Sequence, residues 1–142
     1  MPGSGKSTYL EKLGAPGLSS DEIRCLLSDD PENQNIHRRV FGALRYLLKH
    51  RIALRRPLTY IDATNLTPYE RRPYVRLAGL HECDIQAIFF DVPVEECQRR
   101  NRARDRVVPG EVIAQMARRL VPPTVEEGFS RVLRISAIMK EI

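Results

Sequence analysis

The stretch Pro2-Gly3-Ser4-Gly5-Lys6-Ser7-Thr8 restricts the possible folds of this chain more than any other part of its sequence. Its Gly-Lys-Ser ending fills the last three positions of the phosphate-binding pattern G-x-x-x-x-G-K-[ST]. Glycines in such a loop let backbone N–H groups curl around phosphate oxygens, and the helix that follows adds the positive end of its dipole. A Gly/Ser-rich disordered terminus is the alternative, but the loop runs straight into the helix-like segment 9–13. The sequence therefore predicts a nucleotide-binding α/β domain.

Each part of the loop has a distinct expected role. Lys6 supplies a positive charge for the β- and γ-phosphates of ATP, and the Ser7 hydroxyl supplies a ligand for Mg²⁺. ATP and Mg²⁺ are therefore the expected cofactors. The candidate ATP-binding residues are Gly3, Ser4, Gly5, Lys6, Ser7 and Thr8.

The strand that normally delivers such a loop is not seen in the sequence. The first glycine of the pattern would fall one position before Met1, and the apolar strand would come before that glycine. We therefore expect a parallel sheet without its first, central strand, and a working protein with about ten more residues upstream. Taken as it stands, the chain is expected to fold poorly or to bind ATP weakly.

Composition limits the remaining possibilities. The 142 residues allow one domain, residues 1–142, and 42% apolar with 29% charged residues is ordinary for a globular protein. No apolar run approaches a membrane span, and no signal peptide precedes the loop, so we expect a cytoplasmic protein without a membrane partner. Cys25, Cys83 and Cys97 show no metal-binding spacing and are expected to be partly buried small hydrophobic residues in a reduced compartment. The net charge of +5 attracts polyanions without identifying one.

Helix and strand signals alternate along the rest of the chain. Ser19 with Glu22, and Thr67 with Glu70, have the spacing of capping boxes and mark two helix starts. The order strand, helix, strand, helix predicts a three-layer α/β/α fold with a parallel sheet and right-handed crossovers. The expected strands are a short piece around residue 18 and residues 57–62, 85–90 and 129–135. The expected helices begin near residues 6, 20, 36, 68, 94 and 109, the longest covering 36–54.

Acidic and basic side chains follow the expected strands. Asp21 and Arg24 come directly after the first short strand, and Asp62 ends the strand 57–62. Because ligands gather at the carboxyl ends of parallel strands, these residues are expected near the site. Five arginines then lie within residues 99–106, and like charges this dense require an anionic neighbour for at least some of them.

Other features leave alternatives open. A basic stripe on the long helix is either an acceptor-binding face or a solvated surface. It consists of Arg38, Arg45, Lys49 and Arg56. Tyr69 and Tyr74 either stack on a base or, as we favour, pack the helix on the sheet. The three histidines, His37, His50 and His81, have no arrangement typical of metal ligands and are expected to be surface residues.

With these landmarks in order, the chain resembles the P-loop kinases, and among them the polynucleotide 5′-hydroxyl kinases and their relatives, often filed as AAA-type predicted kinases. The resemblance covers nearly the whole chain, and its combination of Ser-Ser-Asp-x-x-Arg with Asp-x-Thr-Asn is more specific than the loop alone. The segments that carry it are 2–8, 19–24, 62–65, 100–104, 108–109 and 127–129.

The resemblance implies roles for particular residues. The acid at Asp21 accepts the proton of the acceptor hydroxyl, and Arg24 holds an acceptor phosphate. Arg100 and Arg104 belong to a lid, approximately residues 99–108, that folds over the nucleotide. Asp62 lies near Mg²⁺ with Ser7, while Thr64 and Asn65 face the acceptor or the γ-phosphate, and Arg71 or Arg72 reaches the acceptor.

The residues also allow plainer interpretations of these positions. Asp21 is otherwise a favourable charge in the first turn of a helix, and Asp62 a strand-end acid that hydrogen-bonds a turn. Arg100 and Arg104 are otherwise part of a solvated helix face.

Three functions follow from this reading. The first is an ATP- and Mg²⁺-dependent kinase that phosphorylates a polynucleotide 5′-hydroxyl end, in nucleic-acid repair and in association with or fused to other repair modules. The second is a P-loop kinase of a small-molecule alcohol. The third is an ATP-binding module without turnover, which the expected loss of the central strand favours.

Overall fold

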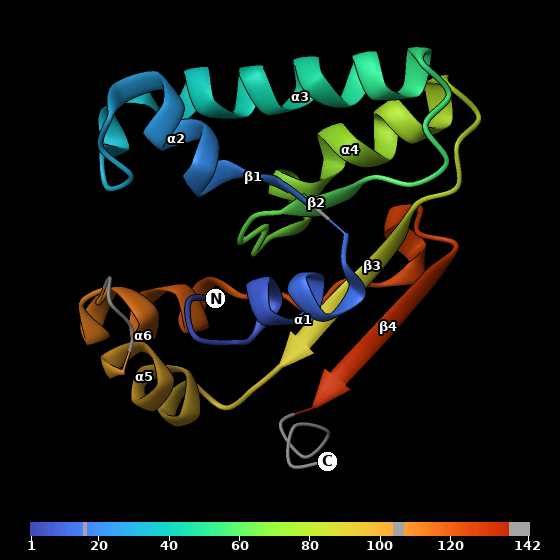
Figure 1. Ribbon diagram of the computed structural model, residues 1–142. Helices are drawn as coiled ribbons and strands as arrows, with labels where there is room; N and C mark the ends of the chain where they lie inside the picture. The colour runs from blue at the N-terminus through green and yellow to red at the C-terminus, as the bar shows by residue number, and fades with distance from the viewer. Residues whose placement is uncertain (16, 104–106, 137–142) are drawn as a thin grey trace. The chain divides into compact units, whose positions relative to one another are not determined.

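The computed structural model describes residues 1–15, 17–103 and 107–136 (Figure 1). The chain forms two compact units, one of Met1–Lys6 with Thr64–Ile142 and the other of Ser7–Ala63. Each unit combines helices with a two-stranded parallel sheet, so the predicted α/β class is confirmed. Arg104, one of the predicted lid residues, lies outside the described residues.

The Ser7–Ala63 unit is built around a short parallel ladder. Strand β1 (Gly17–Ser19) pairs with β2 (Tyr60–Asp62) in the register Leu18↔Ile61 and Ser19↔Asp62. The two carboxyl ends therefore coincide, as predicted. The helices of this unit are α1 (Lys6–Leu13, whose first residue belongs to the other unit), α2 (Ser20–Ser28), the 3₁₀ turn η1 (Gln34–Ile36) and α3 (His37–Ala53).

Strand β2 is shorter than the sequence pattern predicts. Residues 57–59 lie outside the ladder because Pro57 has no N–H to donate and because Arg51 engages the next two residues. Its Nε donates to Thr59 Oγ1 and its Nη2 to the Leu58 carbonyl, each at 2.8 Å. One arginine from α3 thus fixes the chain that leads into the strand.

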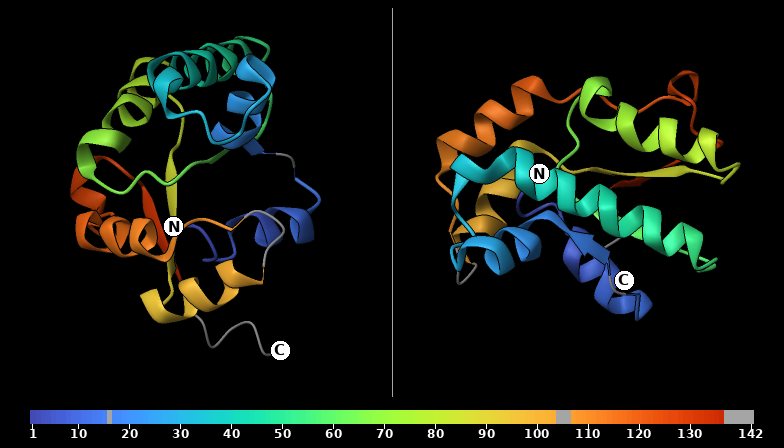
Figure 2. Two further views of the ribbon diagram at one scale, coloured as in Figure 1. Left: turned by 90° about the vertical axis from the view of Figure 1, so that its left-hand side faces the viewer. Right: turned by 90° about the horizontal axis from the view of Figure 1, so that it is seen from above.

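Helix α3 packs on α2 and β1 through part of its length only (Figure 2). Val40 and Leu44 are fully buried, whereas Leu47, one turn further along α3, is 42% exposed. The 17-residue α3 is longer than the nine-residue α2, and its second half extends past that partner. Ser19 caps α2 as predicted, its Oγ accepting from the Glu22 N–H at 3.2 Å.

The second unit contains a longer ladder. Strands β3 (Gln86–Asp91) and β4 (Arg131–Ser136) pair in parallel with Ile88 opposite Leu133 (Figure 1). No residue of β3 is fully buried, although its sequence is largely apolar. Arg134 of β4 pairs with Asp91, the acid that ends β3. The remaining elements are α4 (Pro68–Leu80), α5 (Val94–Arg102), α6 (Gly110–Arg119) and the 3₁₀ turn η2 (Val125–Glu127).

Two local predictions, one for the start of α4 and one for the three cysteines, need adjustment. Thr67 caps α4 as expected, but the Glu70 carboxylate accepts from the Leu66 N–H at 2.8 Å. Of the three cysteines, Cys97 is fully buried in an apolar cluster with Val92 and Ile113. Cys25 and Cys83 are exposed, so the expectation of partial burial is wrong for both.

Candidate phosphoryl-transfer site

The loop before α1 has the backbone geometry that its glycines allow. Gly3 and Gly5 have φ angles of +78° and +102°, a region that side chains disfavour. The Ser4 N–H donates to the Met1 carbonyl at 3.2 Å, which closes a tight turn, and α1 begins at Lys6 as predicted. The first N–H groups of α1 therefore follow directly on the curled loop.

Gly3 is also required by its close approach to another segment. A Cβ atom built at this position would lie 2.4 Å from the Cys97 carbonyl oxygen in the first half of α5. Any side chain there would have to displace backbone, in addition to adopting an unfavourable φ. The loop is thus seated against α5 by a contact that only glycine permits.

Lys6 folds back over its own loop. Its Nζ donates to the Met1 carbonyl at 3.2 Å and is partly buried. A neutral carbonyl is a weaker partner for an ammonium group than a charged phosphate oxygen. The loop and its lysine therefore fit a nucleotide phosphate, which would replace the carbonyl as the partner of Lys6.

Ser7 and Asp62 come together at the carboxyl end of β2. The Ser7 Oγ donates to Asp62 Oδ2 at 3.5 Å, the long limit of a hydrogen bond. Among the described residues no three His, Cys, Asp or Glu side chains form a metal cage. Mg²⁺ ordinarily binds one or two protein oxygens together with substrate phosphates. A hydroxyl beside a single carboxylate fits that mode better than it fits a fully protein-bound metal.

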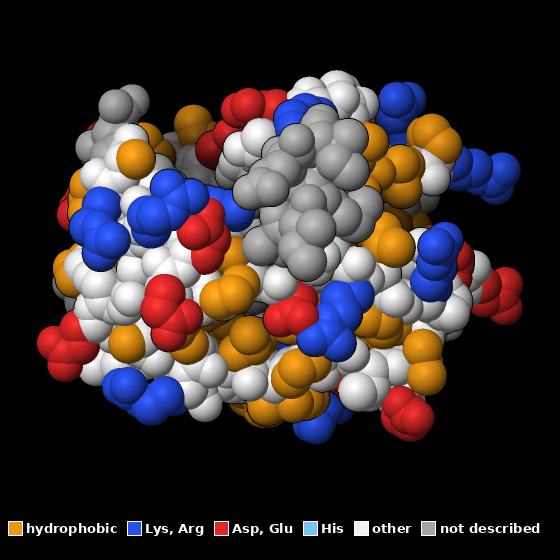
Figure 3. All heavy atoms as spheres, turned by 90° about the horizontal axis from the view of Figure 1, so that it is seen from below, with side chains coloured by type: hydrophobic (Ala, Val, Ile, Leu, Met, Phe, Trp, Pro, Cys, Tyr) orange, Lys and Arg blue, Asp and Glu red, His pale blue; other side chains and the backbone are white. Residues whose placement is uncertain are grey.

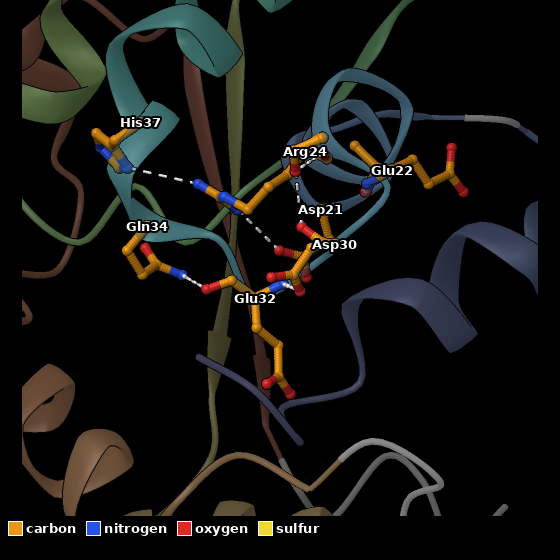
Figure 4. Close-up of polar contacts among 9 residues, drawn as sticks. Asp21, Glu22, Arg24, Asp30, Glu32, Gln34 and His37 are labelled. Atoms are coloured by element: carbon orange, nitrogen blue, oxygen red, sulfur yellow. Dashed lines mark hydrogen bonds and ion pairs between the residues drawn. The ribbon is translucent and has the colours of Figure 1, made fainter.

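Asp21 and Arg24 form an ion pair on α2 (Figure 4). Arg24 Nη1 lies 3.2 Å from Asp21 Oδ1, and the arginine is only 4% exposed whereas the aspartate side chain is 56% exposed. The Arg24 Nε is buried and has no hydrogen-bond partner among the described residues. The pair thus combines an accessible carboxylate with a guanidinium whose donors are incompletely used.

His37 is part of this group, although the sequence suggested only a surface residue. His37 is exposed, as expected, and its Nδ1 lies 3.5 Å from Arg24 Nη2 (Figure 4). The two residues are separated by 13 positions and an irregular connection, so no helical or strand spacing signals their contact.

Arg100 is held by an acid that the sequence analysis did not single out. Its Nε donates to Glu96 Oε1 at 2.8 Å, and Arg99 also binds Glu96. The hydrogen bond from Arg99, together with that from Arg100, lowers the pKa of Glu96 to about 2. Because Glu96 lies three and four residues before these arginines on α5, helical spacing could have identified it. The Arg100 Nη1 remains buried without a hydrogen-bond partner among the described residues.

Asn101 closes the segment that follows α5. Its side chain is buried, accepting from the Val108 N–H at 2.9 Å and donating to the Val108 carbonyl. The two ends of the predicted lid segment are therefore tied to each other by one amide group.

The candidate acceptor residues after β2 have different surroundings. Thr64 is exposed, and Asn65 adopts a left-handed φ of +43° while its carbonyl accepts from Arg71 Nη1 at 2.9 Å. Arg71 also binds Glu127 through Nε and Nη2 at 2.9 and 3.0 Å and is 5% exposed. Three of the five N–H donors of Arg71 are engaged and the side chain is nearly inaccessible to solvent, so these contacts favour a structural role for it.

The two tyrosines of α4 also differ in their exposure. Tyr74 is buried and packs, as favoured from the sequence, whereas Tyr69 is 76% exposed. The guanidinium of Arg72, the exposed neighbour of Arg71, lies 6.0 Å from the Tyr69 ring centroid. Of the two arginines left open by the sequence, Arg72 is the exposed one and is therefore the better candidate for contact with a ligand.

A comparison with protein-family models places these features in a class. The model described as "AAA domain" matches residues 1–123, and the chain belongs to this family. Its members are nucleotide-binding P-loop domains and include P-loop kinases, so the chain is an enzyme of the general kinase or ATPase type. Binding of the nucleotide in such domains typically involves Mg²⁺.

A search of curated proteins found no significant match. Across the described part of the chain, none of the helices combines the length and the apolar character needed to cross a bilayer.

Proposed function

We propose that this protein is a kinase that transfers the γ-phosphate of ATP to a hydroxyl acceptor, the 5′-hydroxyl end of a polynucleotide. The observation that carries the proposal is the pairing of accessible Asp21 with buried Arg24 at the start of α2. An enzyme that only hydrolyses ATP has no acceptor to deprotonate or to hold. It therefore does not need a carboxylate and a guanidinium, in addition to the phosphate-binding loop, next to a strand end.

The proposed division of roles follows from the chemistry of each group. Lys6 and the loop N–H groups bind the phosphates of ATP, while Ser7 and Asp62 hold the Mg²⁺, which when bound neutralises charge on the phosphate oxygens. Asp21 takes the proton of the attacking hydroxyl, and Arg24 binds a phosphate of the acceptor. Arg100 contributes its Nη1 donor, which has no hydrogen-bond partner among the described residues, to the phosphates of ATP, together with Arg104, four positions later in the sequence. Thr64 and Asn65 are assigned to the acceptor.

A polynucleotide acceptor is supported by exposed cations on and just after α3. Arg38, Lys49 and Arg56 are exposed along or just beyond α3, and a strand of nucleic acid requires phosphate contacts beyond its reacting end. On the face shown in Figure 3, by contrast, basic and acidic side chains are interspersed.

The direct test is transfer of label from γ-labelled ATP to oligonucleotides that carry a 5′-hydroxyl, beside a panel of small alcohols. We expect labelling of the oligonucleotide, with a KM that rises steeply with salt concentration because phosphate contacts release counterions. Label on a small alcohol alone would identify the second kinase class, and release of phosphate without any transfer would exclude a kinase.

Replacing Lys6 by alanine is expected to lower the transfer rate by about 10²- to 10³-fold, since one electrostatic contact to the reacting phosphate is lost. Lys12, an exposed lysine in the last turn of the same helix, provides the matched control. Rate measurements with saturating ATP should show the loss in Lys6→Ala and not in Lys12→Ala. Equal rates for the two variants would remove Lys6 from the site.

We further propose that the fold has three layers, helices on both sides of a parallel sheet, and that the central strand of this sheet lies directly before the loop. Isolated two-stranded sheets are marginally stable in water, and both sheets of this chain have two described strands. Adding an apolar strand that ends in glycine before Met1 should raise the melting temperature and tighten ATP binding. A strand of the same length with alternating lysines is the control, and an equal response to both would contradict the proposal.

A further inference from the structure

We propose that His37 is a positioning residue that holds the guanidinium of Arg24 beside Asp21 and so sets how tightly an acceptor phosphate binds. This inference rests on the proposed function for the role of Arg24. The contact itself belongs to the Ser7–Ala63 unit alone.

Arg24 has two anchors at opposite ends of its guanidinium (Figure 4). Nη1 meets Asp21 Oδ1 at 3.2 Å, and Nη2 meets His37 Nδ1 at 3.5 Å. A guanidinium has only donors, so Nδ1 has to accept in this contact. The contact therefore requires a neutral imidazole with its proton on Nε2.

The two contacts of Arg24 restrain its guanidinium relative to different helices. The contact with Asp21 joins residues three apart on one helix, and the aspartate side chain is 56% exposed. The contact with His37 joins α2 to the first residue of α3, and it reaches a side chain that is 95% buried. His37 therefore fixes the guanidinium relative to the neighbouring helix, which a contact within α2 does not do.

His37 is itself held in place. Its ring packs against Phe41, one turn further along α3, with the ring centroids 4.6 Å apart and the planes inclined by 49°. An imidazole that is restrained in this way offers Nδ1 from a defined direction. The remaining Nε donor of Arg24, buried and without a described hydrogen-bond partner, is then available to a phosphate of the acceptor.

Loss of His37 should therefore act on acceptor binding and spare ATP binding. Phenylalanine keeps the packing on Phe41 but has no acceptor atom, whereas asparagine places an oxygen at the position of Nδ1 along the side chain. With a 5′-hydroxyl oligonucleotide, we expect His37→Phe to raise the acceptor KM about five- to tenfold, the upper part of the range for one ordinary intramolecular hydrogen bond. The kcat and the KM for ATP should stay within about twofold of the wild type, and His37→Asn should restore most of the acceptor KM.

Several results would overturn the inference. An unchanged acceptor KM in His37→Phe would do so, as would a fall in kcat alone or an equal change in both variants. A cooperative thermal transition in each variant, with a midpoint above the assay temperature, is the check that each is folded.

A second measurement does not depend on turnover. Long-range ¹H–¹⁵N spectra of the wild-type imidazoles should show His37 with its proton on Nε2, and the Arg24 Nε–H resonance should shift in His37→Phe but not in His37→Asn. A proton on Nδ1 of His37 would refute the contact. If the wild type transfers no phosphate while the spectra are as expected, the proposed function fails and the positioning of Arg24 stands.

Discussion

Replacing Asp21 by asparagine should lower kcat for transfer by about 10²- to 10⁴-fold, the usual contribution of a positioned general base. The amide keeps the size of the side chain and one oxygen for Arg24 Nη1, but it cannot accept the proton of the attacking hydroxyl. Binding of ATP should remain unchanged, because Asp21 is not assigned to the nucleotide. Single-turnover transfer and a separate equilibrium measurement of ATP binding check the two halves of this result.

Glu22 provides the matched control for this prediction. It is the next acid in the first turn of α2 and is likewise exposed, so Glu22→Gln removes the same charge from the same helix end. We expect Glu22→Gln to retain nearly full activity. If both variants lost activity equally, the cause would be the missing negative charge at the start of α2, and not the loss of proton transfer by Asp21.

Replacing Arg71 by methionine should cost about 3 kcal/mol in the free energy of unfolding, at the lower end for a broken buried pair. The substitution leaves the carboxylate of Glu127 without its bidentate partner. In the intact pair the side chain of Arg71 is 6% exposed and that of Glu127 is 15% exposed. It also removes the donor to the Asn65 carbonyl. Urea unfolding of the variant measures the loss.

Two companion variants isolate the cause of that loss. Arg72→Met, which changes the exposed neighbour on α4, should be nearly neutral. The double variant Arg71→Met with Glu127→Gln should be more stable than Arg71→Met, since it removes the unpaired charge. A double variant as unstable as the single one would show that packing, and not the ion pair, stabilises this region.

The same pair predicts a dependence on pH. Hydrogen bonds from Arg71 hold the pKa of Glu127 below its ordinary 4.5. A group whose pKa is lowered by folding stabilises the protein above its unfolded value and loses that contribution as pH falls through the folded value. The difference in unfolding free energy between wild type and Arg71→Met should therefore shrink below about pH 4.5, within the same urea experiment.

Features with local causes could be predicted from the sequence. The caps at Ser19 and Thr67 depend on residues three apart, and the start of α1 at Lys6 follows from the loop pattern. The parallel pairing of strands also follows, because helices separate them along the chain. The pairing of Asp21 with Arg24 lies within reach as well, since helical spacing places them on one side of α2.

Features with distant causes could not be predicted in this way. Arg71 and Glu127 are 56 residues apart, so nothing local distinguishes Arg71 from the exposed Arg72 beside it. Arg24 and His37 meet only because α2 and α3 pack together. The exposure of Leu47 likewise depends on where a neighbouring helix ends, which no periodic pattern within α3 contains.

The small sheets have a practical consequence for handling the protein. Within the described residues each strand pairs on one side only, so the backbone N–H and C=O groups of its opposite side take no part in either ladder. Where such unpaired backbone groups are reached by an extended segment of another molecule, they promote association as the protein concentration rises. The exposed arginines of β4, Arg131 and Arg134, oppose this tendency by placing charge where another chain would have to dock.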